Sequence, residues 1–460
     1  MPILLSVAFL FYTLLSWILL FRDSWTLEVL QTKFYPQQAI LIEQIRSLLS
    51  NFKLNTVPTF LFLLFVFVAF VVYFRSLKQT FSPAKIIFFS VVFQIIVFFS
   101  YPILSTDVLS YILSDRIAVV YRQNVWTTKP NLFPTDPYFF LVYPVYVASD
   151  WTNQTRIYGP VNQVVYSAVT AISGDDLFIN LAAHKLVVLV FNLATILLVY
   201  KILKEHFPDK LKFVLVFIFW NPLFILETVG SGHNDILMIF FILLSYLFFL
   251  RKSPILVALS LALAASVKST ALFLAPFYLV VFLGQRLTTM VKFALTFIGA
   301  YLAIFSTMGV SFLAMINRTS YSTTLYWQSL PQQLSKLSPV TIRFLTPLFL
   351  IYYAAQSLRG LLLRKIDPLV LYGQAYFVYL VFAVGAYWNW YSLWALTALA
   401  FLGWGKWSKA AAAFTFTSAL AYPLYWFSLR FDYQHPLWPV IIYLVILSGP
   451  VVAFLHDKTR

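Results

Sequence analysis

The chain has 460 residues, of which 61% are hydrophobic and only 10% are charged, and it contains no cysteine. Apolar runs long enough to cross a bilayer as helices recur from one end to the other. The alternating pattern of a membrane barrel strand is not seen. The composition therefore predicts an all-α polytopic membrane protein, and it excludes disulfides and thiolate metal sites.

We expect about fourteen membrane-spanning helices, in a single membrane-embedded domain covering residues 1–460. The expected spans are 2–21, 57–74, 86–105, 181–200, 213–230, 235–250, 254–267, 269–284, 293–310, 340–357, 368–387, 391–405, 410–428 and 437–455. The first is expected to be a retained helix and not a signal peptide, because no basic residues precede it and its apolar core is long.

The net charge of +16 is distributed by topology. With the N-terminus inside, the inner turns hold 18 of the 32 basic residues but only four of the 16 acidic ones. This asymmetry follows the positive-inside rule, so both termini are expected in the cytoplasm and a nucleic-acid partner is not expected. Residues 1–56 would form an N-terminal helix and an outer segment. Residues 106–180, broken by prolines, would form an outer catalytic loop with short interfacial helices.

Asp107 stands where an apolar run ends and this outer loop begins. An ionised carboxylate beside hydrocarbon is costly, so such a residue is a functional candidate. Helical spacing would place Ser110, Tyr111 and Ser114 on the same face, and hydroxyls beside a carboxylate suit a general base. The alternative is a helix N-cap. Asp115, two turns further on, is expected to matter less.

Two other turns, later in the chain, also carry polar groups. Arg156 and Tyr158 precede a Gly-Pro pair, where a rigid turn could bring backbone near a ligand and the arginine could bind an anion; a plain turn is equally compatible. His233, Asn234 and Asp235 lie between two apolar runs, and a helix N-terminus there favours a phosphate or a carboxylate. A metal site is less favoured, because only two good ligands lie nearby.

Lys268 interrupts an apolar stretch that is about twice the length of one span, so it would mark the outer end of a helical hairpin. It could bind a lipid phosphate or extend to the interface. Trp390 and Tyr391, like the loop 317–328, offer aromatic rings that suit either sugar platforms or an interfacial belt.

Taken in order, these motifs resemble those of bacterial polyprenol-phosphate-mannose-dependent alpha-mannosyltransferases, which belong to the GT-C glycosyltransferase superfamily. The resemblance spans roughly residues 100–400 and rests on the segments Leu104–Tyr111, Tyr158–Pro160, Gly232–Asp235, Val267–Lys268 and Trp390–Trp394. It implies a GT-C-like helical bundle in the bacterial plasma membrane. It also implies an inverting enzyme that transfers a sugar, mannose, from a polyprenyl-phosphate donor to a glycan or glycolipid acceptor at the extracytoplasmic face.

By this resemblance Asp107 corresponds to the acidic residue of the first catalytic loop and would be the base. The candidate substrate-binding residues are Tyr111, Arg156, Tyr158, His233, Asn234, Asp235, Lys268, Trp390 and Tyr391. The chain departs from the family pattern in two ways. Its acidic loop follows the third expected span and not the first, and Asp107 has no adjacent acid, so a divalent metal is possible but not supported.

Two other classes of protein remain compatible with the sequence. A transporter or flippase of a lipid-linked saccharide would also need outward-facing polar groups, together with broken helices and deep charges. A structural assembly subunit is the third possibility, and only the clustering of acids on one face speaks against it.

Overall fold

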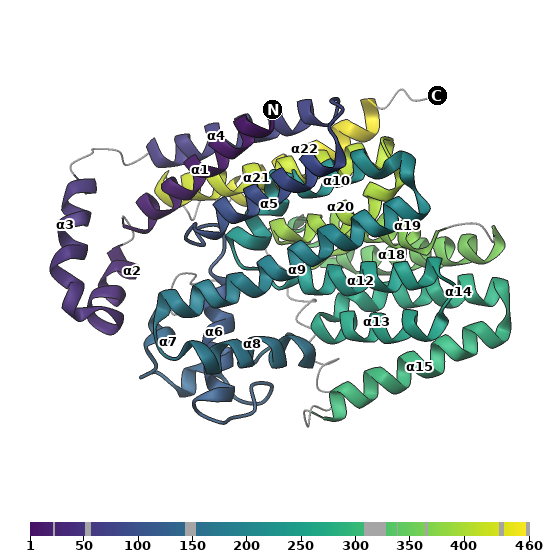
Figure 1. Cartoon of the computed structure of the whole chain (residues 1–460), viewed down its shortest axis with the longest axis horizontal. Helices are drawn as coiled ribbons and strands as arrows, with labels where there is room; N and C mark the ends of the chain where they lie inside the picture. The colour runs from purple at the N-terminus through teal and green to yellow at the C-terminus, as the bar shows by residue number, and fades with distance from the viewer. Residues whose placement is uncertain are drawn as a thin grey trace.

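The computed structural model describes residues 1–21, 24–50, 57–142, 153–307, 328–337, 339–363, 367–431 and 437–456. In these residues the regular structure is helical and includes no strand. The long apolar helices run roughly side by side across the molecule (Figure 1). The chain is therefore an all-α membrane protein, as the composition predicted.

The first and last helices form one side of the bundle (Figure 1). They are α1 (Pro2–Leu20), α4 (Val57–Ser76), α5 (Pro83–Phe98), α21 (Lys406–Phe431) and α22 (Leu437–His456). Helix α1 packs against α4 and α5, whereas α21 packs against α4 and α22. Two helices of the N-terminal outer segment, α2 (Ser24–Val29) and α3 (Ala39–Ser50), extend away from this side. The chain ends thus meet through α4 and α21.

The middle of the chain supplies the remaining helices of the bundle. They are α9 (Leu177–His206), α10 (Leu211–Phe219), α11 (Pro222–Ile225), η6 (Leu226–Gly230), α12 (Asp235–Leu250), α13 (Pro254–Val267), η7 (Ser269–Leu274), α14 (Ala275–Gln285), α15 (Leu287–Ser306), α17 (Leu330–Leu337), α18 (Pro339–Leu362), α19 (Pro368–Val378), η9 (Tyr379–Ala383), η10 (Asn389–Tyr391), α20 (Ser392–Leu399) and η11 (Ala400–Leu402). Helix α12 packs between α9 and α13.

Three shorter helices lie together at one end of the bundle, below α9 in the view of Figure 1. They are α6 (Asp107–Val119), α7 (Pro137–Val142) and α8 (Pro160–Ser173). Helix α6 packs against α7, α8 and α9. Short helices were expected in the segment 106–180, and proline begins both α7 and α8, where its missing amide hydrogen is not needed.

The expected number of spans is not confirmed. Of the described helices, five are long and apolar enough to cross a membrane, or six if the bent pair Pro208–Phe219 and Pro222–Gly230 is one span. The break comes at Asn221-Pro222, because proline cannot continue the preceding helix. Helix α20 has only eight residues, far fewer than the ~20 that a span needs. The expected span 391–405 is therefore a short, buried helix.

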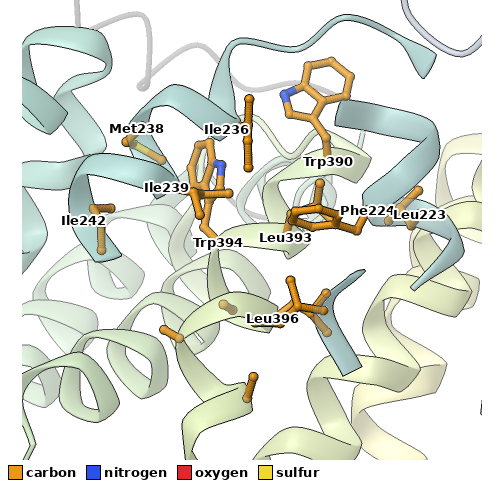
Figure 2. Packing of buried hydrophobic residues seen from close by; sticks show 14 of the residues in the cluster. Leu223, Phe224, Ile236, Met238, Ile239, Ile242, Trp390, Leu393, Trp394 and Leu396 are labelled. Atoms are coloured by element: carbon orange, nitrogen blue, oxygen red, sulfur yellow. The ribbon is translucent and has the colours of Figure 1, made fainter. Parts of the chain in front are cut away.

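The core beneath the candidate site is apolar and tightly packed. Leu393 and Leu396 of α20 pack with Leu223 and Phe224 of α11, and Ile236 lies close by (Figure 2). Each of these side chains is fully or almost fully buried. The irregular segments η6, which contains Glu227, and η10, which contains Trp390, thus lie next to a close-packed apolar layer.

Candidate active site

Asp107 is the first residue of α6, directly after the turn that follows α5. Its backbone N–H donates to Ser105 Oγ at 3.2 Å, and the Tyr111 hydroxyl, one helical turn on, donates to Asp107 Oδ2 at 3.3 Å. Thr106 occupies the N-cap position of the helix, and its side chain makes no capping hydrogen bond. The carboxylate is therefore oriented by a phenol and remains 17% exposed.

The Tyr158 hydroxyl meets that of Tyr111 at 3.1 Å, and the two rings pack edge to face. Tyr158 is held by its backbone: Trp126 Nε1 donates to the Tyr158 carbonyl at 2.9 Å, and the Gly159 N–H donates to the Val267 carbonyl at 3.1 Å. A Cβ atom at position 159 would lie 2.2 Å from the Ser266 carbonyl oxygen. Only glycine permits this approach between the outer loop and the end of α13.

His233 lies between Asp107 and Glu227. Its Nδ1 is 3.4 Å from the Tyr111 hydroxyl and 3.9 Å from Asp107 Oδ2, and its Nε2 is 3.3 Å from Glu227 Oε2. The ring stacks on Trp390 with centroids 4.0 Å apart. The preceding Gly232 has a φ of 75°, a left-handed conformation that a glycine adopts without strain.

Lys268 and Asp235 form a second buried pair. Lys268 Nζ donates to Asp235 Oδ1 at 2.8 Å, and Trp394 Nε1 donates to the same oxygen at 2.6 Å. The ammonium group also lies over the rings of Tyr158, Tyr391 and Trp394, at 5.4, 5.2 and 4.9 Å from their centroids. Aromatic faces and one carboxylate thus compensate the desolvated charge.

Arg156, a candidate anion-binding residue, lies against an acid, while its Nε and Nη2 atoms are buried without a hydrogen-bond partner among the described residues. Its Nη1 donates to Asp115 Oδ1 at 2.7 Å, and both side chains are buried. Gln163 donates to the same oxygen at 3.1 Å, and His184 Nε2 is 3.4 Å from the other. The positive charge of Arg156 is therefore already balanced, and Asp115, to which the sequence assigned little importance, fastens the outer loop to α6, α8 and α9.

Three other candidates occupy enclosed positions. Trp390 is 5% exposed, and its ring is stacked between His233 and Trp388. Tyr391 stacks on Trp394, with centroids 4.3 Å apart, beneath Lys268. Asn234 is the N-cap residue that precedes α12 and is fully buried, and its side-chain amide has no hydrogen-bond partner among the described residues. The part of the aromatic loop from residue 317 to 327 lies outside the described residues.

A pocket opens beside Asp107, between α6 and the loop that precedes α8. It is lined by Asp107, Ser110, Tyr111, Leu113, Ser114, Pro130, Gln154, Thr155, Arg156, Ile157 and Tyr158. Burial raises the pKa of the Asp107 carboxyl above its usual range, while the positive charges of His233 and Lys268 act in the opposite direction. Burial likewise raises the pKa of the Tyr158 phenol well above its ordinary value, so this group stays neutral and able to donate a hydrogen bond.

The arrangement joins groups that are far apart in the sequence. A chain of contacts links Asp107, Tyr111, Tyr158, Lys268 and Asp235, and a second links Asp107 to His233 and Trp390. In the part of the chain that the structure describes, no cluster of three or more His, Asp or Glu side chains has a geometry suited to a metal ion.

Sequence reasoning did not assign two residues that complete the site. Glu227, in the turn before His233, is fully buried, and Tyr422 of α21 donates its hydroxyl to Glu227 Oε1. The signal for Glu227 was an acid at the end of an apolar run, eight residues before Asp235. Tyr422 had no such signal, because a tyrosine inside a long apolar helix is usual.

The segments that carry Asp107, Tyr158, His233 and Lys268 lie within a region that matches a known family. The family model described as "Alpha-(1->6)-mannopyranosyltransferase, N-terminal domain" matches residues 13–284, more than half of the chain. Alpha-(1->6)-mannopyranosyltransferase A of Corynebacterium glutamicum is 29% identical over 140 residues, which are 30% of this chain and 28% of that protein. The match thus spans less than a third of this curated relative. Because the family model covers most of the helices that carry Asp107, His233 and Lys268, the chain belongs to the alpha-(1->6)-mannopyranosyltransferase family.

Proposed function

We propose that the protein is a mannosyltransferase that transfers mannose from a polyprenyl-phosphate donor to a glycan or glycolipid acceptor, with Asp107 as the general base. The observation that carries the proposal is the setting of this carboxylate. It is oriented by Tyr111, it lines a pocket together with the residues Ser110 and Ser114, and the basic side chains of His233 and Lys268 lie nearby. Family membership supports the same class of reaction.

The proposed reaction is a single displacement. As the acceptor oxygen attacks the anomeric carbon of mannose, its hydroxyl proton passes to Asp107 and the bond from that carbon to the phosphate oxygen breaks. The electron pair leaves with the lipid phosphate, and attack from the opposite side inverts the anomeric configuration. Lys268 would stabilise the departing phosphate, since its ammonium lies over the Tyr158 ring, its charge acts on Asp107, and fixed charges aimed at a leaving group lower the barrier.

We also propose that the site lies on the extracytoplasmic side of the plasma membrane. The support is the distribution of Lys and Arg between the turns, which places the segment 106–180 outside. The polyprenyl chain would remain in the bilayer while its phosphate reaches the polar residues at the end of the helices. This arrangement suits helices α9 and α12, which are apolar over most of their length.

The replacement Asp107→Asn tests the proposal. It preserves the size of the side chain but cannot accept a proton, so turnover should fall by a factor on the order of 10² to 10⁴. The assay is transfer of mannose from a short-chain polyprenyl-phosphate mannose to an alkyl mannoside by purified protein. Asp175→Asn is the matched control, because its carboxylate is 81% exposed and lies on the same loop. Undiminished transfer by folded Asp107→Asn protein would refute the role of Asp107.

A transporter of lipid-linked saccharides is the second candidate, and one observation favours it. The segments Pro208–Phe219 and Pro222–Gly230 form a helix broken by 59°, a feature common at the binding sites of transporters. Vesicles containing the Asp107→Asn or the wild-type protein separate the two functions. If the protein is a transporter, the Asp107→Asn variant would still move a fluorescent polyprenyl-phosphate sugar between the leaflets. If it is an enzyme, the wild type would transfer mannose without moving this lipid between the leaflets.

A further inference from the structure

Glu227 is a fully buried carboxylate that the proposed reaction does not use. It lies in η6, and its two oxygens have different neighbours: Tyr422 donates a hydrogen bond to Oε1, and His233 Nε2 is 3.3 Å from Oε2 without a hydrogen bond. A buried carboxylate without partners would be strongly destabilising, so both contacts matter for its charge. The position of Glu227 therefore depends on the imidazole of His233.

Two carboxylates flank the His233 ring. Nδ1 is 3.4 Å from the Tyr111 hydroxyl and 3.9 Å from Asp107 Oδ2, and Nε2 is 3.3 Å from Glu227 Oε2. The contact with Glu227 is a close approach and not a hydrogen bond, because neither Nε2 nor Oε2 has a hydrogen-bond partner among the described residues. A carboxylate within about 4–6 Å favours the cationic form of an imidazole.

We propose that Glu227 is a positioning residue for the general base: it holds His233 as a cation whose Nδ1 edge faces Asp107, and so keeps the Asp107 carboxylate ionised. The inference rests on the proposed function, because it gives Glu227 a part in the same transfer. The stacking of Trp390 on the imidazole, at 4.0 Å, prevents the ring from turning away. The resulting order is carboxylate, imidazolium and carboxylate, with the cation between the two acids.

The other groups around this triad do not supply the same charge balance. The titratable and charged side chains that face it are Tyr12 of α1, Tyr111 of α6, Tyr158, Lys185 of α9, Asp235 of α12, Lys268, Tyr387 and Tyr422 of α21. Asp235 is bonded to Lys268 and Trp394, and the Lys185 ammonium donates to the Ser100 carbonyl. Of the described carboxylates, Glu227 is thus the one in contact with His233 Nε2.

The direct test is the charge of His233, read by NMR of the full-length protein with labelled histidine near neutral pH. The chain has five histidines, and the resonance of His233 is assigned by its loss in His233→Gln or by replacing the other four in turn. We expect a cationic ring in the wild type and a neutral ring in Glu227→Gln, which keeps the shape of the side chain. Glu227→Asp, which keeps the charge, should restore the cation.

The second readout is the pH profile of mannose transfer. A cation about 4 Å from Asp107 favours its ionised form, so Glu227→Gln should move the acidic limb of turnover to higher pH by about one unit. A residue with only a packing role would lower the thermal stability and leave this limb in place. Thermal unfolding of each variant is therefore measured in parallel.

The outcomes separate the two proposals. If Asp107→Asn abolishes transfer but His233 is neutral in the wild type, or equally charged in the wild type and Glu227→Gln, the inference about Glu227 is wrong and the proposed function stands. If Asp107→Asn transfers mannose normally, the role of Asp107 as the general base falls, and the NMR result alone decides whether Glu227 controls the charge of His233.

Discussion

The close approach at Gly159 offers a sharp test of how the outer loop supports the site. In Gly159→Ala the new Cβ would lie 2.2 Å from the Ser266 carbonyl oxygen, and an ordinary contact begins at 3.4 Å. Because the obstacle is backbone at the end of α13, no side-chain rotation relieves it. The loop and the helix must separate by about 1 Å, and a shift of that size at reacting groups costs on the order of 10²-fold in rate.

The shift would act through Tyr158, which directly precedes Gly159. Its hydroxyl is 3.1 Å from that of Tyr111, so a displacement of this size breaks the hydrogen bond, and it also removes the ring from the Lys268 ammonium. We expect transfer of mannose to fall about 10²-fold. Thermal unfolding followed by tryptophan fluorescence should show a loss of about 1–3 kcal/mol, the usual cost of overpacking.

Gly299→Ala is the matched control, because Gly299 lies within α15 and a Cβ there would meet nothing within 4 Å. This variant should keep wild-type transfer, and its stability should rise by about 1 kcal/mol or less, since alanine favours helix. Equal transfer by the Gly159→Ala and Gly299→Ala proteins would refute the claim that the loop must touch α13 for the site to form.

Three further predictions follow from the geometry. Asp115→Ala leaves the buried guanidinium of Arg156 without its carboxylate, so thermal unfolding should reveal a loss of about 3–5 kcal/mol, and a change under 1 kcal/mol would contradict the assigned ion pair. Because burial raises the pKa of Asp107, transfer should be lost on acidification already at a pH above about 3.9, the usual pKa of an aspartic acid. Over the same pH range the folded protein binds a proton more readily than the unfolded chain, so acidification should stabilise the fold. This gain in stability should be absent in Asp107→Asn. A cysteine at the exposed position Asn131 should react with an impermeant thiol reagent in intact cells, whereas one at Gln79, in the turn after α4, should react only after lysis; the reverse would invert the topology.

The helices were largely predictable because apolar length is a local property of the sequence. The expected boundaries of 235–250 and 254–267 coincide with those of α12 and α13. The number of spans was not predictable in the same way. A run such as 213–230 is apolar throughout, yet Pro222 divides it, and whether a break bends a helix or ends a span depends on the neighbouring helices.

The candidate site shows the same division between local and distant information. Asp107, His233 and Lys268 were recognisable as charged groups at the ends of apolar runs, where they are costly. Their partners were not, because pairing depends on which helices meet. The sequence indicated no acid partner for Arg156, so an anion-binding role was an open hypothesis. In the fold α6 and α8 pack against each other, and Asp115 lies beside the Arg156 guanidinium.

The pairing of charges also bears on how a donor would be bound. Each of the two basic side chains near Asp107 already lies against an acid: Glu227 contacts His233, and Asp235 accepts from Lys268. An anionic phosphate that approached Lys268 would therefore compete with Asp235, which also accepts from Trp394 and could keep that bond if the lysine turned away. His233 has no such freedom, because its ring is stacked on Trp390 and lies between Tyr111 at Nδ1 and Glu227 at Nε2. In the proposed reaction Lys268 is thus the residue suited to follow the leaving phosphate, and His233 the one suited to hold the charge beside the base.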